Sequence, residues 1–223
     1  MSNISYVALS RQTALRTEMD IIANNIANMT TPGFRAQQLA VAERLAGEDQ
    51  QNNDVSQVMT QSAFLVTDAG PLKRTGNPFD VAIEGTGYFE IQIAPGEKGY
   101  IRTSSMKLDE AGNLTTEAGY QVVDDGGIPI SIPENAQSLA ISRDGVISTD
   151  DGEIATMKLV EFKNEHDLEP YGNGVYVSEE GPTGLVEDSI LLQGVLEGSN
   201  VKPILEMSRM IDVSRSYQST QNI

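Results

Sequence analysis

Few residues in this 223-residue chain could support catalysis. The single histidine, His166, lies in the polar stretch 163–170, so a histidine-based catalytic triad would rest on one residue in a poor setting. The chain contains no cysteine, which excludes thiolate nucleophiles, thiolate metal sites and disulfides. Carboxylates are abundant, yet no pair stands out as an acid–base couple. The sequence therefore predicts no catalytic residue and no enzymatic activity.

Three turns resemble ligand-binding motifs without meeting their requirements. Gly85-Thr86-Gly87 lacks the third glycine, the following helix and the lysine of a phosphate-binding loop, so we interpret it as a hairpin turn. The stretches 108–117 and 148–156 resemble calcium loops, but neither places oxygen ligands at alternate positions before a closing glutamate. We therefore expect no cofactor and no metal site.

The charge of the chain points toward proteins as partners. A formal net charge of -17 would repel nucleic-acid phosphates and an anionic membrane surface, so we expect no nucleic acid as a partner. No apolar run is long enough to span a bilayer, which predicts no direct membrane insertion. The first residues also lack the pattern of a cleaved secretory signal.

The elements that must position an interface lie at the two ends of the chain. A three-four alternation of apolar residues predicts a coiled-coil-like helix over about 3–28. Pro32 and Gly33 mark its end, because proline disfavours helix at the residue before it and glycine accepts a tight exit turn. The residues of this seam are Ile4, Ala8, Leu15, Met19, Ile22, Ile26 and Met29.

A second helix is predicted near the C-terminus, with Asn200 as its N-cap and Pro203 in its first turn. Its pattern still runs at Ile223, so the helix is expected to fray there or to continue. Each helix has one narrow apolar seam, and we expect both to stay poorly ordered until subunits assemble. The C-terminal seam consists of Met207, Met210, Ser214, Tyr217 and Gln221, with Ile204 and Ile211 beside it.

Between the helices the pattern is typical of β structure. Residues 37–63 are polar with weak periodicity and are expected to form an extended connector. From 64 to 192, alternating apolar residues and frequent glycine turns predict an antiparallel sandwich or barrel. The fold class is therefore α+β, a mainly antiparallel β domain flanked by N- and C-terminal helices. The expected segments are 1–36, 37–63, 64–192 and 193–223.

Three asparagines near the end of the first helix need an explanation. Asn24, Asn25 and Asn28 span more than one helix face, so they cannot all lie in a single two-helix seam. One interpretation is that they are exposed and only mark the helix end. The other is that they fix the register of the helix among several neighbours, since a buried amide requires hydrogen-bond partners.

The stretch "ANNIANMTTPGFRAQ" (23–37) resembles the N-terminal signature of the flagellar rod and hook axial proteins. The match is at Ala23, Asn24, Asn25, Ala27, Asn28, Thr31, Gly33 and Phe34, with Arg35 at a position usually held by lysine. Four further stretches resemble the same family in order, namely 80–91, 100–123, 139–148 and 191–218. Within the family, the terminal helices are most similar to proximal-rod members, with distal-rod members second.

The resemblance implies a structural subunit of the flagellar basal-body rod that assembles helically into the shaft transmitting torque from motor to hook. The implied partners are copies of the chain, other rod proteins and the flagellar type III export apparatus, with export that needs no cleaved leader. The terminal helices are then expected to form an inner layer. The expected assembly interface consists of Leu15, Met19, Ile22, Asn24, Asn25, Ile26, Asn28, Gly33, Phe34, Asn200, Ile204, Met207, Ile211 and Tyr217.

Two other classes of protein remain open at this stage. A carbohydrate-binding or adhesion module built on the β region would need exposed aromatic residues on one face, and this region offers five scattered tyrosines. A glycosidase-like hydrolase would need two convergent carboxylates, which sequence alone does not locate. The five tyrosines are Tyr88, Tyr100, Tyr120, Tyr171 and Tyr176.

Overall fold

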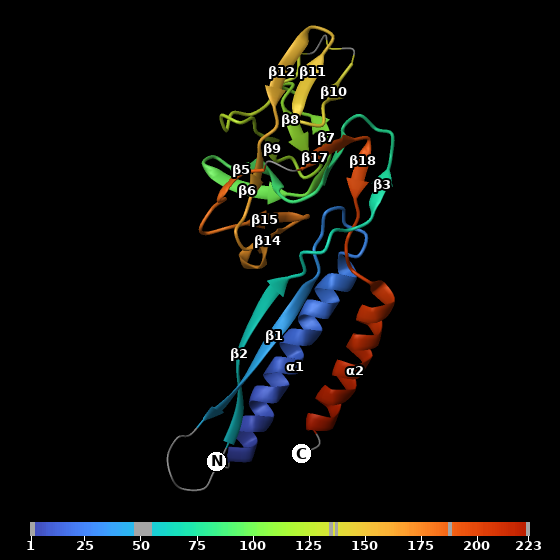
Figure 1. Ribbon diagram of the computed structural model, residues 1–223. Coiled ribbons are helices and arrows are strands. Elements are labelled where there is room, and N and C mark those ends of the chain that lie inside the picture. The colour runs from blue at the N-terminus through green and yellow to red at the C-terminus, as the bar shows by residue number, and fades with distance from the viewer. Residues whose placement is uncertain (1–2, 47–54, 134–135, 137, 187–188, 222–223) are drawn as a thin grey trace. The chain divides into compact units, whose positions relative to one another are not determined.

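The computed structural model describes residues 3–46, 55–133, 136, 138–186 and 189–221, and the chain forms two compact units (Figure 1). The first, here called the helical unit, comprises Met1–Met29, Ala36–Val66 and Val201–Ile223. The second, here called the β unit, comprises Thr30–Arg35 and Thr67–Asn200. Each unit therefore brings together segments that are far apart in sequence.

The helical unit contains two helices and a long two-stranded hairpin. Helix α1 (Asn3–Ala27) packs against α2 (Pro203–Gln221) and against strands β1 (Gln37–Ala46) and β2 (Val55–Leu65). The two strands pair antiparallel along their lengths, with one register shift in β1. The segment expected to be an extended connector is thus a hairpin within the described residues, since strand pairing satisfies the backbone polar groups that a free connector would leave to water.

The terminal helices pair within the chain, which corrects the expectation that each lacks a partner before assembly. The inner face of α2 is formed by Glu206, Val213 and Thr220, which repeat every seven residues and are all buried. Two of these three residues are polar, so the apolar periodicity of the sequence does not identify this face. Met207, expected in the seam, lies on the exposed side instead.

The β unit consists of antiparallel strands, which confirms the predicted fold class. Its largest sheet has the order β14-β15-β6-β5-β9-β8-β7-β4-β17, with β13 and β16 branching from β5. Strands β10–β12 form a separate three-stranded sheet, and β18 pairs with β3. The elements are β3 (Leu72–Arg74), β4 (Asp80–Glu84), β5 (Tyr88–Ala94), β6 (Glu97–Ile101), β7 (Thr103–Leu108), β8 (Leu114–Thr116), β9 (Gln121–Val122), β10 (Ala140–Ile141), β11 (Val146–Thr149), β12 (Gly152–Thr156), β13 (Leu159–Glu161), the 3₁₀ helix η1 (Glu165–Asp167), β14 (Glu169–Gly172), β15 (Val175–Val177), β16 (Gly184–Leu185), β17 (Ile190–Gln193) and β18 (Val195–Glu197).

One apolar core fills the β unit. Val81 and Ile83 from β4 and Phe89 and Ile91 from β5 are buried in it, as their alternation predicts. The predicted hairpin between these strands is wrong, however, because β4 pairs with β7 and β17 while β5 pairs with β6, β9 and β13. The glycine turn between them is a corner that leads the chain from one part of the sheet to another.

Candidate assembly interface

Asn25 lies in the last turn of α1 and is 1% exposed. Its side-chain amide donates hydrogen bonds to the carbonyl oxygen of Gln37 at 2.9 Å and to Oε2 of Glu206 at 3.2 Å. Its Oδ1 accepts a hydrogen bond from the backbone N–H of Gln37 at 2.9 Å. One amide group therefore joins α1 to the start of β1 and to α2. This explains why a polar residue occupies a buried helix position.

The other two asparagines have more local roles. Asn28 is half-buried, and its side-chain amide donates to the backbone oxygen of Asn24 at 2.9 Å and to its Oδ1 at 3.0 Å. Asn24 is exposed and makes a long hydrogen bond to the side chain of Gln37 at 3.4 Å. These contacts tie the last turn of α1 to itself and to the first residue of β1. The three asparagines thus share a motif but differ in burial and in role.

The apolar residues expected at the assembly interface divide into two groups. On α1, Ile22 is buried, whereas Leu15, Met19 and Ile26 are half-buried. Tyr217 on α2 is also half-buried. These side chains belong to the helical unit, where α1 packs against α2 and the hairpin.

The outer side of α2 carries an apolar stripe that no described residue of the helical unit covers. Ile204 is 87% exposed, Met207 47% and Ile211 52%, and their spacing places them on one face. Leu205, on a neighbouring face, is also exposed. We call Ile204, Met207 and Ile211 the α2 stripe. Isolated exposed apolar side chains are common, but a continuous stripe on one helix is typical of a packing surface.

Gly33 and Phe34 lie inside the β unit. Gly33 has a φ of +69°, and a Cβ added there would lie 3.0 Å from Cγ2 of Thr103. Its N–H donates to the backbone oxygen of Glu197 at 2.9 Å, and Phe34 is buried beside it. The Thr-Thr-Pro-Gly-Phe signature is therefore a turn docked tightly on the β unit, where only glycine fits without strain.

Asn200 is not the N-cap of α2, which begins at Pro203. Its side-chain amide donates to the backbone oxygen of Asp68 at 2.8 Å, and its N–H donates to the oxygen of Phe34 at 3.3 Å. Asn200 therefore joins three segments of the β unit, 30–35, 67–70 and 197–200, each of which lies next to the helical unit in sequence.

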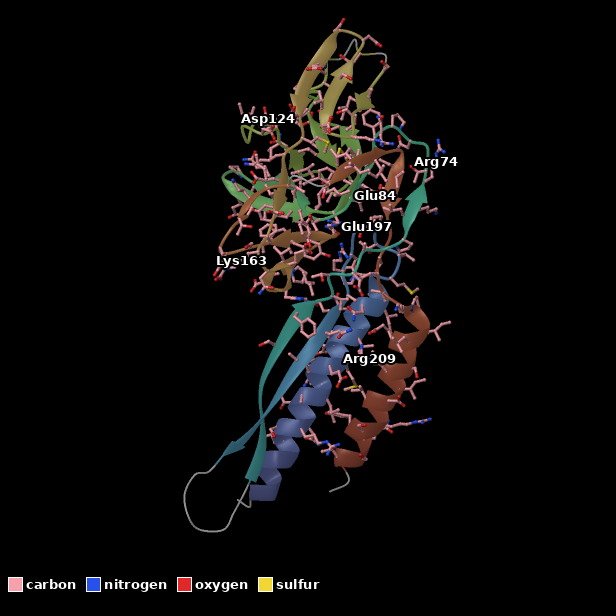
Figure 2. The ribbon with its side chains drawn as sticks, viewed as in Figure 1. Arg74, Glu84, Asp124, Lys163, Glu197 and Arg209 are labelled. Carbon is pink, nitrogen blue, oxygen red and sulfur yellow. The ribbon has the colours of Figure 1, made fainter. Side chains whose placement is uncertain are left out.

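A buried charge cluster holds the same three segments together. Glu197, labelled in Figure 2, is 1% exposed and forms ion pairs with Nη2 of Arg35 at 3.3 Å and with Nε of Arg102 at 3.2 Å. It also accepts a hydrogen bond from the N–H of Gly70 at 2.9 Å. Arg35 in turn donates to the backbone oxygens of Thr67, at 2.7 Å, and Asp68. Sequence reasoning missed this cluster because its members are far apart in the chain.

Arg102 also explains the corner between β4 and β5. Its guanidinium group donates to the backbone oxygens of Gly85 at 2.8 Å and Gly87 at 2.5 Å. Both glycines have positive φ values, so their carbonyl groups can turn toward the arginine. The fork of donors on arginine can bind a carboxylate and two carbonyls at once, which the single ammonium of lysine could not reproduce.

Tyr176 completes the cluster with its hydroxyl group. The oxygen accepts a hydrogen bond from the N–H of Arg35 at 2.7 Å, and the hydroxyl donates to the oxygen of Gly33 at 3.1 Å. Burial raises the pKa of Tyr176 to about 12, although the hydrogen bond from Arg35 acts in the opposite direction. The hydroxyl therefore stays protonated and keeps donating at neutral pH. The cluster positions chain segments, because its charged groups are buried and bonded to one another.

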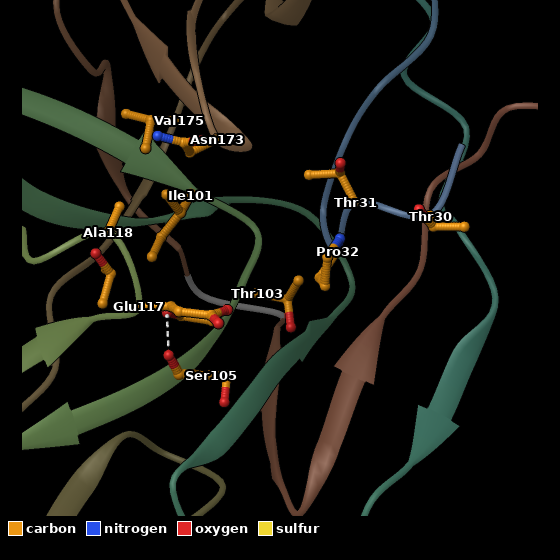
Figure 3. A pocket seen from close by; sticks show the side chains of 12 residues that line it. Thr30, Thr31, Pro32, Ile101, Thr103, Ser105, Glu117, Ala118, Asn173 and Val175 are labelled. Atoms are coloured by element: carbon orange, nitrogen blue, oxygen red, sulfur yellow. Dashed lines mark hydrogen bonds between the residues drawn. The ribbon is translucent and has the colours of Figure 1, made fainter. Parts of the chain in front are cut away.

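A cavity of about 430 Å³ opens in the β unit beside Thr30, Thr31 and Pro32 (Figure 3). Half of its lining residues are serines or threonines, its exposed wall is mainly apolar, and Glu117 is its one titratable group. Among the residues that the structure describes, no group of three or more histidines and carboxylates could hold a metal ion. Within the same residues, no helix is long and apolar enough to cross a membrane.

The tyrosines do not form the exposed platform that a carbohydrate-binding module would need. Tyr88, Tyr100 and Tyr176 are buried in the β unit, and Tyr88 packs edge to face against Tyr176. Tyr120 is half-buried, and only Tyr171 of the five is exposed. The aromatic residues of this region therefore serve the packing of the β unit.

Comparison with known proteins agrees with this arrangement of segments. Residues 6–35 match the family described as "Flagella basal body rod protein", and residues 82–149 match "Flagellar hook protein FlgE/F/G D1 domain". Residues 192–223 match "Flagellar basal body rod FlgEFG protein C-terminal". The matches coincide with the N-terminal helix and its turn, with part of the β unit, and with the C-terminal segment.

Similar whole proteins carry the same description. The chain is 35% identical to the flagellar basal-body rod protein FlgF of Caulobacter vibrioides, over 98% of this chain and 91% of that protein. It is 37% identical to FlgF of Rhizobium meliloti, over 96% of this chain and 88% of that protein. It is 31% identical to FlgG of Bacillus subtilis, over 98% of this chain and 92% of that protein. The chain therefore belongs to the flagellar basal-body rod family, whose members are structural proteins and not enzymes.

Proposed function

We propose that this chain is a subunit of the proximal rod, the part of the flagellar shaft nearest the motor. The identities to the FlgF relatives exceed the identity to the FlgG relative, which supports the proximal over the distal position. In this role the chain passes torque along the shaft by shape and packing, together with copies of itself and other rod proteins. We also propose export through the flagellar type III apparatus, which rests on the family likeness alone.

The observation that carries the assembly proposal is the α2 stripe. Ile204, Met207 and Ile211 expose apolar surface on the side of α2 opposite its buried face. Burying such surface is worth about 25 cal/mol per Å², so a neighbouring subunit that covers the stripe gains stability from it. The half-buried residues Leu15, Met19, Ile26 and Tyr217 can extend this interface, whereas Ile22 and Asn25 support it from inside the helical unit.

The proposal is tested by placing a charge in the stripe. The variant Ile211→Asp should fold normally, because the side chain is exposed in the protomer, but it should lower incorporation into basal bodies and abolish swimming. The matched control is Ser219→Asp, which adds the same charge at an exposed position of α2 outside the stripe. Equal incorporation of the two variants, measured on isolated basal bodies, would contradict this interface.

The export route has a separate test. In a strain whose type III apparatus is inactivated, the chain should accumulate in the cytoplasm, as detected by fractionation and immunoblotting. Its appearance outside the cytoplasm in that strain would show another route.

A further inference from the structure

Strand β3 presents a pair of cations on an open sheet edge. Lys73 and Arg74 are the only two adjacent basic residues in the sequence, and both are exposed. In the described part of the chain, β3 pairs with β18 on one side and has no strand on the other. Neither cation forms an ion pair with a described residue. This edge is therefore open to a partner that carries negative charge.

A groove of about 480 Å³ lies elsewhere on the β unit and has the complementary chemistry. Its lining includes the aromatic ring of Phe162 and the carboxylates of Glu169, Glu179 and Glu180, which are exposed. None of these carboxylates is in an ion pair with another residue that the structure describes.

The aromatic part of the groove is held rigidly. The ring of Phe162 packs edge to face on Tyr100, with 4.8 Å between ring centroids, and on Tyr88, with 5.6 Å. An aromatic ring next to carboxylates suits a guanidinium group, which can stack on the ring while it forms ion pairs at its edge. The groove thus has both elements that bind an arginine side chain.

We propose that Lys73 and Arg74 of one copy dock into this groove of a second copy, with Arg74 over Phe162 and Lys73 near the rim. The inference rests on the proposed function and names a contact between neighbouring subunits. Figure 2 shows Arg74 and Lys163, a residue of the groove, on opposite sides of the β unit. Two different patches on opposite sides of one unit give a head-to-tail contact, which produces an open helical assembly when it does not close into a ring.

Charge supports a second copy as the occupant. Most of the 32 acidic residues of the chain lie in the β unit, so two β units that approach at random repel each other. A local match between the basic edge and the acidic groove offsets this repulsion at one relative position. Such pairing fixes register more than it adds affinity.

Cross-linking in isolated basal bodies tests the contact directly, because the chain has no native cysteine. A chain with Thr75→Cys, next to Arg74, and Thr183→Cys, in the lining of the groove, keeps the charges of the contact; treated with a short bismaleimide, it should give adducts at multiples of the mass of the chain. Co-expressed single variants should give the dimer, and either single variant alone should give none. Incorporated double-cysteine chain without self-adducts would overturn the inference, as would adducts only with a different protein.

Charge reversal provides the second test. Arg74→Glu and Glu180→Lys should each lower incorporation several-fold, and the two changes in one chain should restore at least part of it. Arg143→Glu is the matched control, since Arg143 is an exposed arginine of the same unit and the change in charge is the same as for Arg74→Glu. If Arg74→Glu is incorporated as well as this control, the docking contact is wrong while the proposed function stands. If the unmodified chain is absent from basal bodies, the proposed function and this inference both fail.

Discussion

Replacing Glu197 with glutamine should destabilise the β unit strongly. The change keeps the size of the side chain but removes the charge that two arginines share, at 3.3 Å from Arg35 and 3.2 Å from Arg102. It also places an amide donor among groups that are themselves donors. Removing one partner of a buried ion pair costs about 3–5 kcal/mol, and Glu197 is fully enclosed, so we expect a loss within that range.

The measurement is the free energy of unfolding from urea titration of the full chain, followed by tyrosine fluorescence, since five of the seven tyrosines lie in the β unit. A loss of this size corresponds to a fall in melting temperature on the order of 10 °C. The control is Glu161→Gln, which removes a charge from an exposed side chain on β13. A difference between the two variants of less than about 1 kcal/mol would refute the role assigned to the cluster.

Four further substitutions test the asparagines of α1, the Thr-Thr-Pro-Gly-Phe turn and the tyrosine of the charge cluster. Asn25→Ala should destabilise the chain by about 1–3 kcal/mol, because it leaves buried groups without partners, whereas Asn24→Ala should be neutral or stabilising by up to about 0.7 kcal/mol; chemical denaturation of the helical signal distinguishes them. Gly33→Ala should cost about 1–3 kcal/mol, since φ is positive and Thr103 is close, and unchanged thermal stability would contradict this. Tyr176→Phe should flatten the alkaline pH dependence of stability. Burial raises the pKa of Tyr176 from its ordinary value of 10.0 to about 12, so its contribution is present below pH 10.0 and is lost as pH rises toward 12. Urea titrations at about pH 9 and about pH 11 measure this dependence. If the assignment were wrong, the free energy of unfolding would fall equally between these pH values in the unchanged chain and in Tyr176→Phe.

The two helices and the strands with clear alternation could be predicted from sequence. The helix predicted over about 3–28 corresponds to α1 at Asn3–Ala27. It could be predicted because the three-four apolar pattern and the Pro-Gly stop are both local signals. The buried residues of β4 and β5 also follow from alternation. Local patterns, however, do not determine which strands pair, and the hairpin predicted between β4 and β5 is absent from the described sheet.

The charge cluster and the true face of α2 could not be predicted, for a common physical reason. Glu197 and Arg102 are charged, and a charged residue is normally assigned to the surface unless its partner is known. Glu206 and Thr220 likewise lie on the buried face of α2 although they are polar. In both places a polar group is buried because distant segments supply its partners, and such partners are visible only in the folded chain.

Asn25 is a third buried polar residue whose partners come from distant segments. The motif is compatible with two interpretations, an exposed residue that marks the helix end or a buried amide with specific partners. The structure supplies partners from β1 and α2, which are encoded 12 and 181 residues away from Asn25. Neither partner carries a local sequence signal that would identify it.

We propose that the exposed face of α2 builds this chain into the rod. An electron-microscopic reconstruction of isolated basal bodies, at a resolution that traces side chains, tests it most directly. We expect the chain to occupy the proximal rod and Ile204, Met207 and Ile211 to be covered by neighbouring subunits. If the chain is incorporated but the α2 stripe faces solvent, the stripe is not an assembly interface; if the chain is absent from the rod, it is not a rod subunit.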